Sequence, residues 1–73
     1  MMSLVYAKTG ETVEVVRIVG GKGISSHLAT MGIYPGVKLK VISSAGFGPL
    51  IVAVNETRIG LGRNMARRIF VKI

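Results

Sequence analysis

The sequence contains no cysteine and no tryptophan, and its 73 residues include one histidine and three acidic residues. Without cysteine the chain forms no disulfide, no thiolate metal site and no thiol nucleophile. A metal cage would have to combine His27 with Glu11, Glu14 and Glu56, and even open zinc sites use three protein ligands. Catalytic sets of a nucleophile, a base and an orienting group need more titratable side chains than one histidine and three glutamates provide. We therefore predict no metal site, no cofactor and no catalytic residue, so that the protein is not an enzyme.

Long hydrophobic runs are also missing. The longest unbroken apolar stretch covers residues 49–54, whereas a transmembrane helix needs about 18–20 apolar residues. The first ten residues have no basic segment in front of an apolar one, which a signal peptide would require. These features predict a protein that is not itself membrane-spanning and is cytoplasmic.

Acidic residues are outnumbered by ten lysines and arginines, which gives a net charge of +7. Such a balance favours anionic partners, which can be nucleic acid, an anionic membrane surface or an acidic protein. The cations are scattered along the chain in runs no longer than two, and there are two tyrosines and two phenylalanines for base stacking. We therefore expect no specific nucleic-acid binding. Solvated charge that keeps an apolar domain soluble remains the alternative to a dedicated partner surface.

Ten glycines divide the chain into short apolar segments, a pattern typical of small antiparallel barrels. We predict strands at residues 3–7, 12–19, 37–43, 50–54, 57–61 and 69–73, with one helical turn at residues 64–66. In the second strand the alternation changes phase between Val15 and Val16, which predicts a bulge or a sharp bend. The whole chain, residues 1–73, is expected to form a single all-β domain. Its predicted fold is a small SH3-like barrel of five to six short strands, with one short helix inserted after the second strand.

Residues 24–31 form the predicted helix. Ile24, Leu28 and Met31 fall on one stripe at helical spacing, and Ser25 or Ser26 is expected to cap the N-terminus. With about two turns, this helix must be held by packing rather than by its own propensity.

Structural turns are predicted directly after this helix. Gly32 stands where helices end with a left-handed residue. In Tyr34-Pro35-Gly36, proline sets φ at the second position of a type II turn and glycine supplies the positive φ of the third.

A partner-binding surface is predicted around the helix and its neighbouring loops, because function concentrates on loops held by a rigid scaffold. The outer face of the helix would carry the hydroxyl and imidazole groups, aromatic side chains would flank it, and one lysine would steer a partner at the edge. The alternatives are that the helix closes one end of the barrel with Leu28 and Met31, and that the flanking aromatic residues fill the core. The predicted residues are Lys22, Ser26, His27, Thr30, Tyr34 and Phe47.

The order of these features resembles the FeoA family over nearly the whole chain. The resemblance rests on a leucine of a short helix, then Met31-Gly32, then Pro35-Gly36 leading into a strand, and later on Gly48-Pro49 before a strand and on residues 59–63 and 66–71. Two positions depart from the pattern. His27 stands where many relatives have arginine, and no acidic residue separates Gly48 from Pro49, so contacts made there in relatives are not transferred.

The resemblance implies an SH3-like barrel that is cytoplasmic and accessory to ferrous iron uptake, docking on the cytoplasmic GTP-binding part of the FeoB transporter. The same fold occurs in metal-dependent repressors, so an SH3-like regulatory module of that type is one alternative. A basic nucleic-acid-binding small barrel is another. A direct carrier of ferrous iron is opposed by the number of available ligands. Association into a homo-oligomer is left open.

Overall fold

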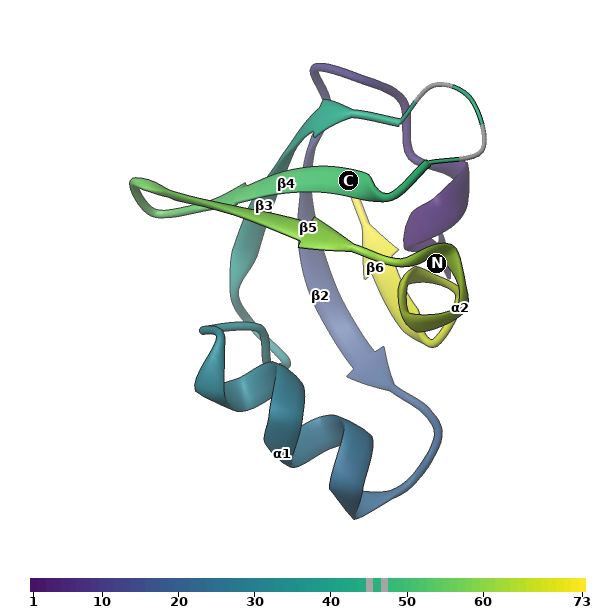
Figure 1. The fold of residues 1–73 in the computed structure, drawn as a ribbon, viewed down its shortest axis with the longest axis vertical. Coiled ribbons are helices and arrows are strands. Elements are labelled where there is room, and N and C mark those ends of the chain that lie inside the picture. Colours follow the sequence, from purple (N-terminus) through teal and green to yellow (C-terminus); the bar gives the residue numbers. More distant parts are fainter. Residues whose placement is uncertain (45, 47) are drawn as a thin grey trace.

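The computed structural model describes residues 1–44, 46 and 48–73, and these fold around six antiparallel strands in one curved sheet (Figure 1). In sheet order the strands are β1, β6, β2, β3, β4 and β5. Along the chain the elements are β1 (Met2–Ser3), η1 (Leu4–Tyr6), β2 (Thr12–Ile18), α1 (Lys22–Thr30), β3 (Lys38–Ser43), β4 (Leu50–Val54), β5 (Thr57–Leu61), α2 (Arg63–Ala66) and β6 (Ile69–Lys72). The predicted all-β SH3-like barrel with one helix after the second strand is confirmed.

Alternation of apolar and polar side chains places the core inside the barrel. In β3 the side chains of Leu39 and Val41 are fully buried, whereas Lys38 and Lys40 are exposed. Successive residues of a strand point to opposite faces of the sheet, so each strand contributes every second residue to the interior. The core residues with less than 5% exposure are Leu4, Ala7, Val13, Val15, Leu28, Ile33, Leu39, Val41, Leu50, Val52, Val54, Leu61, Ala66, Ile69 and Val71.

The break in alternation within β2 is a register shift against β6. Val15 is opposite Val71, but the next paired residue is Arg17, opposite Phe70. The intervening Val16 is 37% exposed. An extra residue on one strand bends that strand and increases its local twist, which helps the sheet to curl. The predicted irregularity between Val15 and Val16 is confirmed.

The predicted strand at residues 3–7 is wrong. Strand β1 ends at Ser3, and a single 3-10 turn, η1, follows, in which the N–H of Ala7 donates to the carbonyl of Leu4 at 3.0 Å. Leu4 and Ala7 are both buried. A strand would point residues three apart toward opposite faces, whereas a helix with three residues per turn brings them to the same side. Burial of both side chains therefore favours the turn over the strand.

A Schellman motif ends α1 and turns the chain back toward the barrel. The N–H of Ile33 donates to the carbonyl of Leu28 at 2.9 Å, and that of Gly32 donates to the carbonyl of Ala29 at 3.0 Å. Gly32 has a φ of +84°, and Leu28 and Ile33 are both completely buried. This hydrogen-bond pattern, with a left-handed residue and an apolar contact, is the usual way in which the last carbonyls of a helix are satisfied.

The turn that leads from α1 into β3 has the predicted type II form. The N–H of Val37 donates to the carbonyl of Tyr34 at 3.1 Å, and Gly36 has a φ of +97°. The N–H of Gly36 also donates to the carbonyl of Val15 at 2.8 Å, which ties the turn to β2.

None of the helices in the described part of the chain has the length and apolarity needed to cross a bilayer.

Replacing Gly32 or Gly36 by valine is expected to lower the free energy of unfolding by about 1–3 kcal/mol at each position, because a β-branched residue is a poor occupant of positive φ. At position 32 the added Cβ would also lie 3.4 Å from Cγ1 of Val54. Thermal unfolding followed by circular dichroism measures the loss.

Gly23→Ala is the matched control. Gly23 lies inside α1, its φ is not positive, and a Cβ there would meet no atom within 4 Å. Alanine at this site should therefore leave stability unchanged or raise it by about 0.5 kcal/mol. A valine variant at 32 or 36 that melts at the wild-type temperature would contradict the role given to that glycine.

Candidate functional site

Helix α1 begins two residues earlier than the sequence predicts, at Lys22 rather than Ile24. Gly20 and Gly21 have φ values of +117° and +92°, so two glycines turn the chain out of β2 before the helix starts. The N–H of Ser25 donates to the carbonyl of Gly21 at 3.1 Å. Gly21 is therefore the N-cap residue, with no side-chain cap, and the predicted capping by Ser25 or Ser26 is wrong. Both serines lie within the helix.

The start of α1 is packed against the chain that leads into β6. A Cβ built on Gly20 would lie 2.7 Å from Cδ1 of Ile24 and 2.9 Å from Nη1 of Arg68, closer than real contacts allow. In addition, the N–H of Val19 donates to the carbonyl of Arg68 at 2.9 Å. The inner side of α1 carries the buried Leu28, with Ile24 and Met31 partly buried against the core. Both ends of the helix are thus fixed to the barrel.

The outer side of α1 presents the residues that the sequence singles out. Lys22, Ser26 and Thr30 follow one another at intervals of four, so they form one line along the helix surface. His27 lies beside this line, and all four side chains are exposed. The hydroxyl of Thr30 donates to the carbonyl of His27 at 2.6 Å. We call these four residues the α1 face: a surface of polar side chains with a cation at its N-terminal end.

Tyr34 lies at the C-terminal side of the α1 face. Its side chain is 51% exposed, so it is not part of the core, and its carbonyl accepts the hydrogen bond that closes the type II turn. Because the turn is bonded to β2 and follows the Schellman motif directly, the position of Tyr34 is set by the same contacts that hold the helix.

Phe47 falls outside the described residues, so the structure does not place this predicted site residue. The structure therefore brings together Lys22, Ser26, His27, Thr30 and Tyr34.

Arg63 is a residue with a specific structural role that the sequence does not reveal. From the first position of α2, its Nη2 donates to the carbonyls of Ser44 at 3.0 Å and of Gly46 at 2.5 Å. Its Nε is buried and has no hydrogen-bond partner among the described residues. Arg63 thus fastens the connection between β3 and β4 to α2. Its position after Gly62 marks a helix start, but nothing in the local pattern points to partners that lie 17 and 19 residues away.

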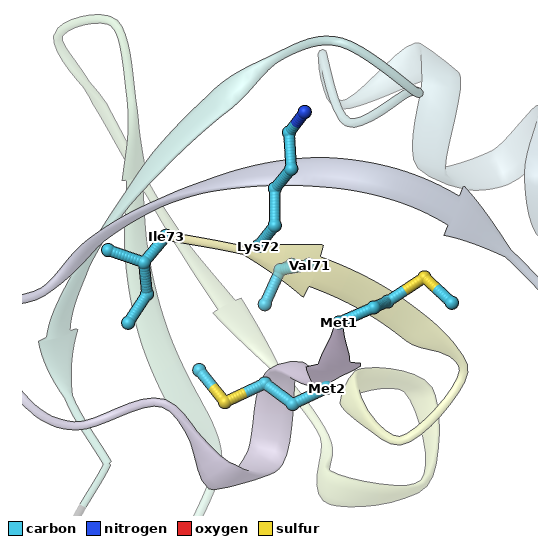
Figure 2. A pocket seen from close by; sticks show the side chains of 5 residues that line it. All are labelled: Met1, Met2, Val71, Lys72 and Ile73. Atoms are coloured by element: carbon cyan, nitrogen blue, oxygen red, sulfur yellow. The ribbon is translucent and has the colours of Figure 1, made fainter.

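A shallow apolar hollow of about 250 Å³ lies where β1 and β6 pair (Figure 2). It is lined by Met1, Met2, Val71, Lys72 and Ile73, none of which belongs to the α1 face. Figure 2 shows the Lys72 side chain extending away from that of Met2.

Among residues 1–44, 46 and 48–73 there is no group of three or more histidine, cysteine or acidic residues arranged to hold a metal ion.

Comparison with known proteins gives a consistent result for sequence and fold. A family model described as the FeoA domain matches residues 2–73. The chain is 42% identical over 72 residues to the "Putative Fe(2+) transport protein A" of Methanocaldococcus jannaschii, covering 99% of this chain and 87% of that protein.

Two solved structures show the same fold. The crystal structure of an iron uptake regulatory protein, FeoA, superposes with a TM-score of 0.90 and 32% identity, covering 97% of this chain and 93% of that one. A manganese-dependent transcriptional repressor superposes with a TM-score of 0.84 and 28% identity, covering 94% of this chain and 39% of the repressor.

Arg63→Ala is expected to lower the free energy of unfolding by about 1–2 kcal/mol, because it removes two charge-assisted hydrogen bonds to backbone carbonyls. Urea unfolding measures the loss, and faster amide exchange at Ser44 and Gly46 would locate it. Arg67→Ala is the control: Arg67 is exposed and donates to the Asn64 side chain at 2.8 Å, so its loss should cost less than about 0.5 kcal/mol. Equal effects of the two substitutions would contradict the role assigned to Arg63.

Proposed function

This chain belongs to the FeoA domain family of ferrous iron transport accessory proteins, and on that premise we propose that it is a cytoplasmic, non-enzymatic module that docks on the cytoplasmic GTP-binding part of the FeoB transporter. We assign the docking to the α1 face and Tyr34. The observation that carries this proposal is the exposure of five predicted residues on one helix and the turn that follows it, both of which are fixed to the barrel.

Preorganisation supports this assignment. Ordering a flexible segment when it binds costs affinity, and a site on a rigid element avoids that cost. Leu28 on the inner side of the helix and Ile33 just after it are completely buried, and glycine turns hold both ends of the helix. The Ser26 and Thr30 side chains are small, so a partner surface can approach the helix closely between Lys22 and Tyr34. Tyr34 adds an aromatic group of the kind enriched at interface centres.

The chemistry of the α1 face indicates what a partner should offer. The Ser26 hydroxyl and the His27 imidazole can each donate or accept a hydrogen bond, and the Lys22 ammonium donates only. A partner segment with a carboxylate near the N-terminal end of α1 and mixed hydrogen-bonding groups along its length would complement this face. Lys22 would then speed the encounter more than it strengthens the complex, as charges at the rim of an interface do.

A second candidate function is a regulatory module like the matching part of a metal-dependent repressor. It is favoured by the superposition of 94% of this chain on a manganese-dependent repressor, of which it covers 39%. In that case the α1 face would bind another protein domain instead of a transporter. Failure to capture the transporter domain, together with capture of a repressor domain by the same face, would favour this function.

We expect His27→Ala and Tyr34→Ala each to weaken binding to the purified cytoplasmic domain of the transporter about 5–30-fold, the range typical of important interface residues. Binding is measured by biolayer interferometry against the immobilised domain. Both side chains are exposed, so neither substitution should change the melting temperature. An unchanged melting temperature would verify that each variant keeps its fold.

Arg67→Ala is the control, since Arg67 is exposed and lies beyond α2, outside the proposed surface. It should bind as the wild type does. If His27→Ala and Tyr34→Ala bind normally while Arg67→Ala abolishes binding, the docking surface is on the C-terminal side of the chain and the assignment fails.

A further inference from the structure

A second surface is formed by cations on the outer face of the sheet. The strand register places Lys38 opposite Glu14, which is in turn opposite Lys72. In the next row Lys40 is opposite Ala53, and Ala53 is opposite Arg58. Arg17 lies on the same face, with its guanidinium carbon 5.5 Å from the centre of the Phe70 ring. We call this surface the basic sheet face; its members are Arg17, Lys38, Lys40, Arg58 and Lys72.

Positive charge dominates this face. All five members are exposed, and half of the ten cations of the chain lie here. Glu14 is the one carboxylate among the outward residues of β2, and Glu56 lies in the turn before Arg58 at the edge. The pairing register places the members on the outward side of the curved sheet, so they are spread around the outside of the barrel instead of being concentrated in one pocket.

The kind of partner follows from this distribution. Protein interfaces are depleted of lysine at their centres and depend on packed aromatic and apolar anchors, whereas three of the five members here are lysines. Single-stranded nucleic acid binds to proteins through aromatic stacking platforms, but the Phe70 ring is occupied by Arg17. Separated, exposed cations on the outside of the curved sheet are instead suited to a diffuse negative charge that needs no stereospecific fit, such as the headgroup layer of a bilayer.

We propose that the basic sheet face adsorbs to a bilayer that contains anionic phospholipid. Lysine and arginine close to such a surface each strengthen its electrostatic attraction for the protein, by about fivefold in the partition coefficient, and the attraction falls off within a Debye length. The face consists of side chains different from those of the α1 face. Adsorption can therefore hold the protein at a membrane while α1 remains free for a protein partner.

Flotation with vesicles tests the proposal. Wild-type protein should float with phosphatidylcholine vesicles that contain about one third phosphatidylglycerol, should stay behind with pure phosphatidylcholine vesicles, and should be released by added salt. Lys40→Glu with Arg58→Glu should weaken binding at least about 25-fold, since two members of the face are lost and their charges are reversed. Both side chains flank the small Ala53 and are exposed, so the fold should be retained, as circular dichroism can verify.

Lys8→Glu with Arg67→Glu is the matched control, because it changes the net charge by the same amount at two exposed positions outside the face. It should reduce vesicle binding less than threefold, roughly the effect expected of distant charges screened by salt. An equal loss in both double variants would overturn the proposal by showing that net charge alone matters. Absence of binding to anionic vesicles would overturn it as well.

Competition with nucleic acid and a variant of the α1 face complete the test. At the same phosphate concentration, a single-stranded oligonucleotide should bind the protein more weakly than the anionic vesicles do; tighter binding to the oligonucleotide would overturn the proposal in favour of nucleic-acid binding. His27→Ala should leave vesicle binding unchanged, because His27 belongs to the α1 face. Loss of vesicle binding in that variant would contradict the separation of the two surfaces. Failure of transporter docking would leave the vesicle result unaffected.

Discussion

The contact between Leu28 and Ile33 is the constraint on which the proposed docking surface depends. Both side chains are fully buried, and the backbone between them is closed by the paired hydrogen bonds of the Schellman motif. A helix of this length would not persist in water without such packing. The same contact sets the direction in which α1 points its exposed side, the place at which Tyr34 emerges, and the start of β3. The exposed residues are therefore positioned by buried ones.

The two surfaces that we distinguish differ in their physics. The α1 face is a rigid arrangement of small polar groups, and its selectivity would come from shape and from hydrogen bonds at fixed positions. The basic sheet face is a set of separated cations, and its attraction would come from long-range electrostatics that salt screens. If both proposals hold, the basic sheet face would bring the protein to a membrane and the α1 face would recognise a partner there. The barrel core, which is continuous beneath both, keeps them in a constant relation.

Local patterns that allow one structural solution predict this fold correctly. The alternation of Lys38, Leu39, Lys40 and Val41, the change of phase after Val15, and the glycines at 32 and 36 each appear in the structure as predicted. Two predictions about local structure were wrong, one for the first apolar segment and one for the start of α1. The first apolar segment looked like a strand because its residues are apolar, but Leu4 and Ala7 had to reach the same core. The serines near the start of α1 looked like caps, but two glycines had already turned the chain.

By itself the sequence determined the class of fold, the turns and the outer face of the helix, because each of these shows in patterns of residues close together in the chain. It also determined the excess of positive charge, which depends on composition alone. Tertiary structure alone decided which distant residues meet. Only the strand register shows that Lys40 and Arg58 flank Ala53, and only the folded chain shows that Arg63 holds the carbonyls of Ser44 and Gly46 and that Gly20 leaves room for Ile24 and Arg68. Such pairings depend on how the strands are ordered around a shared core, and a local pattern of residue types contains no record of that order.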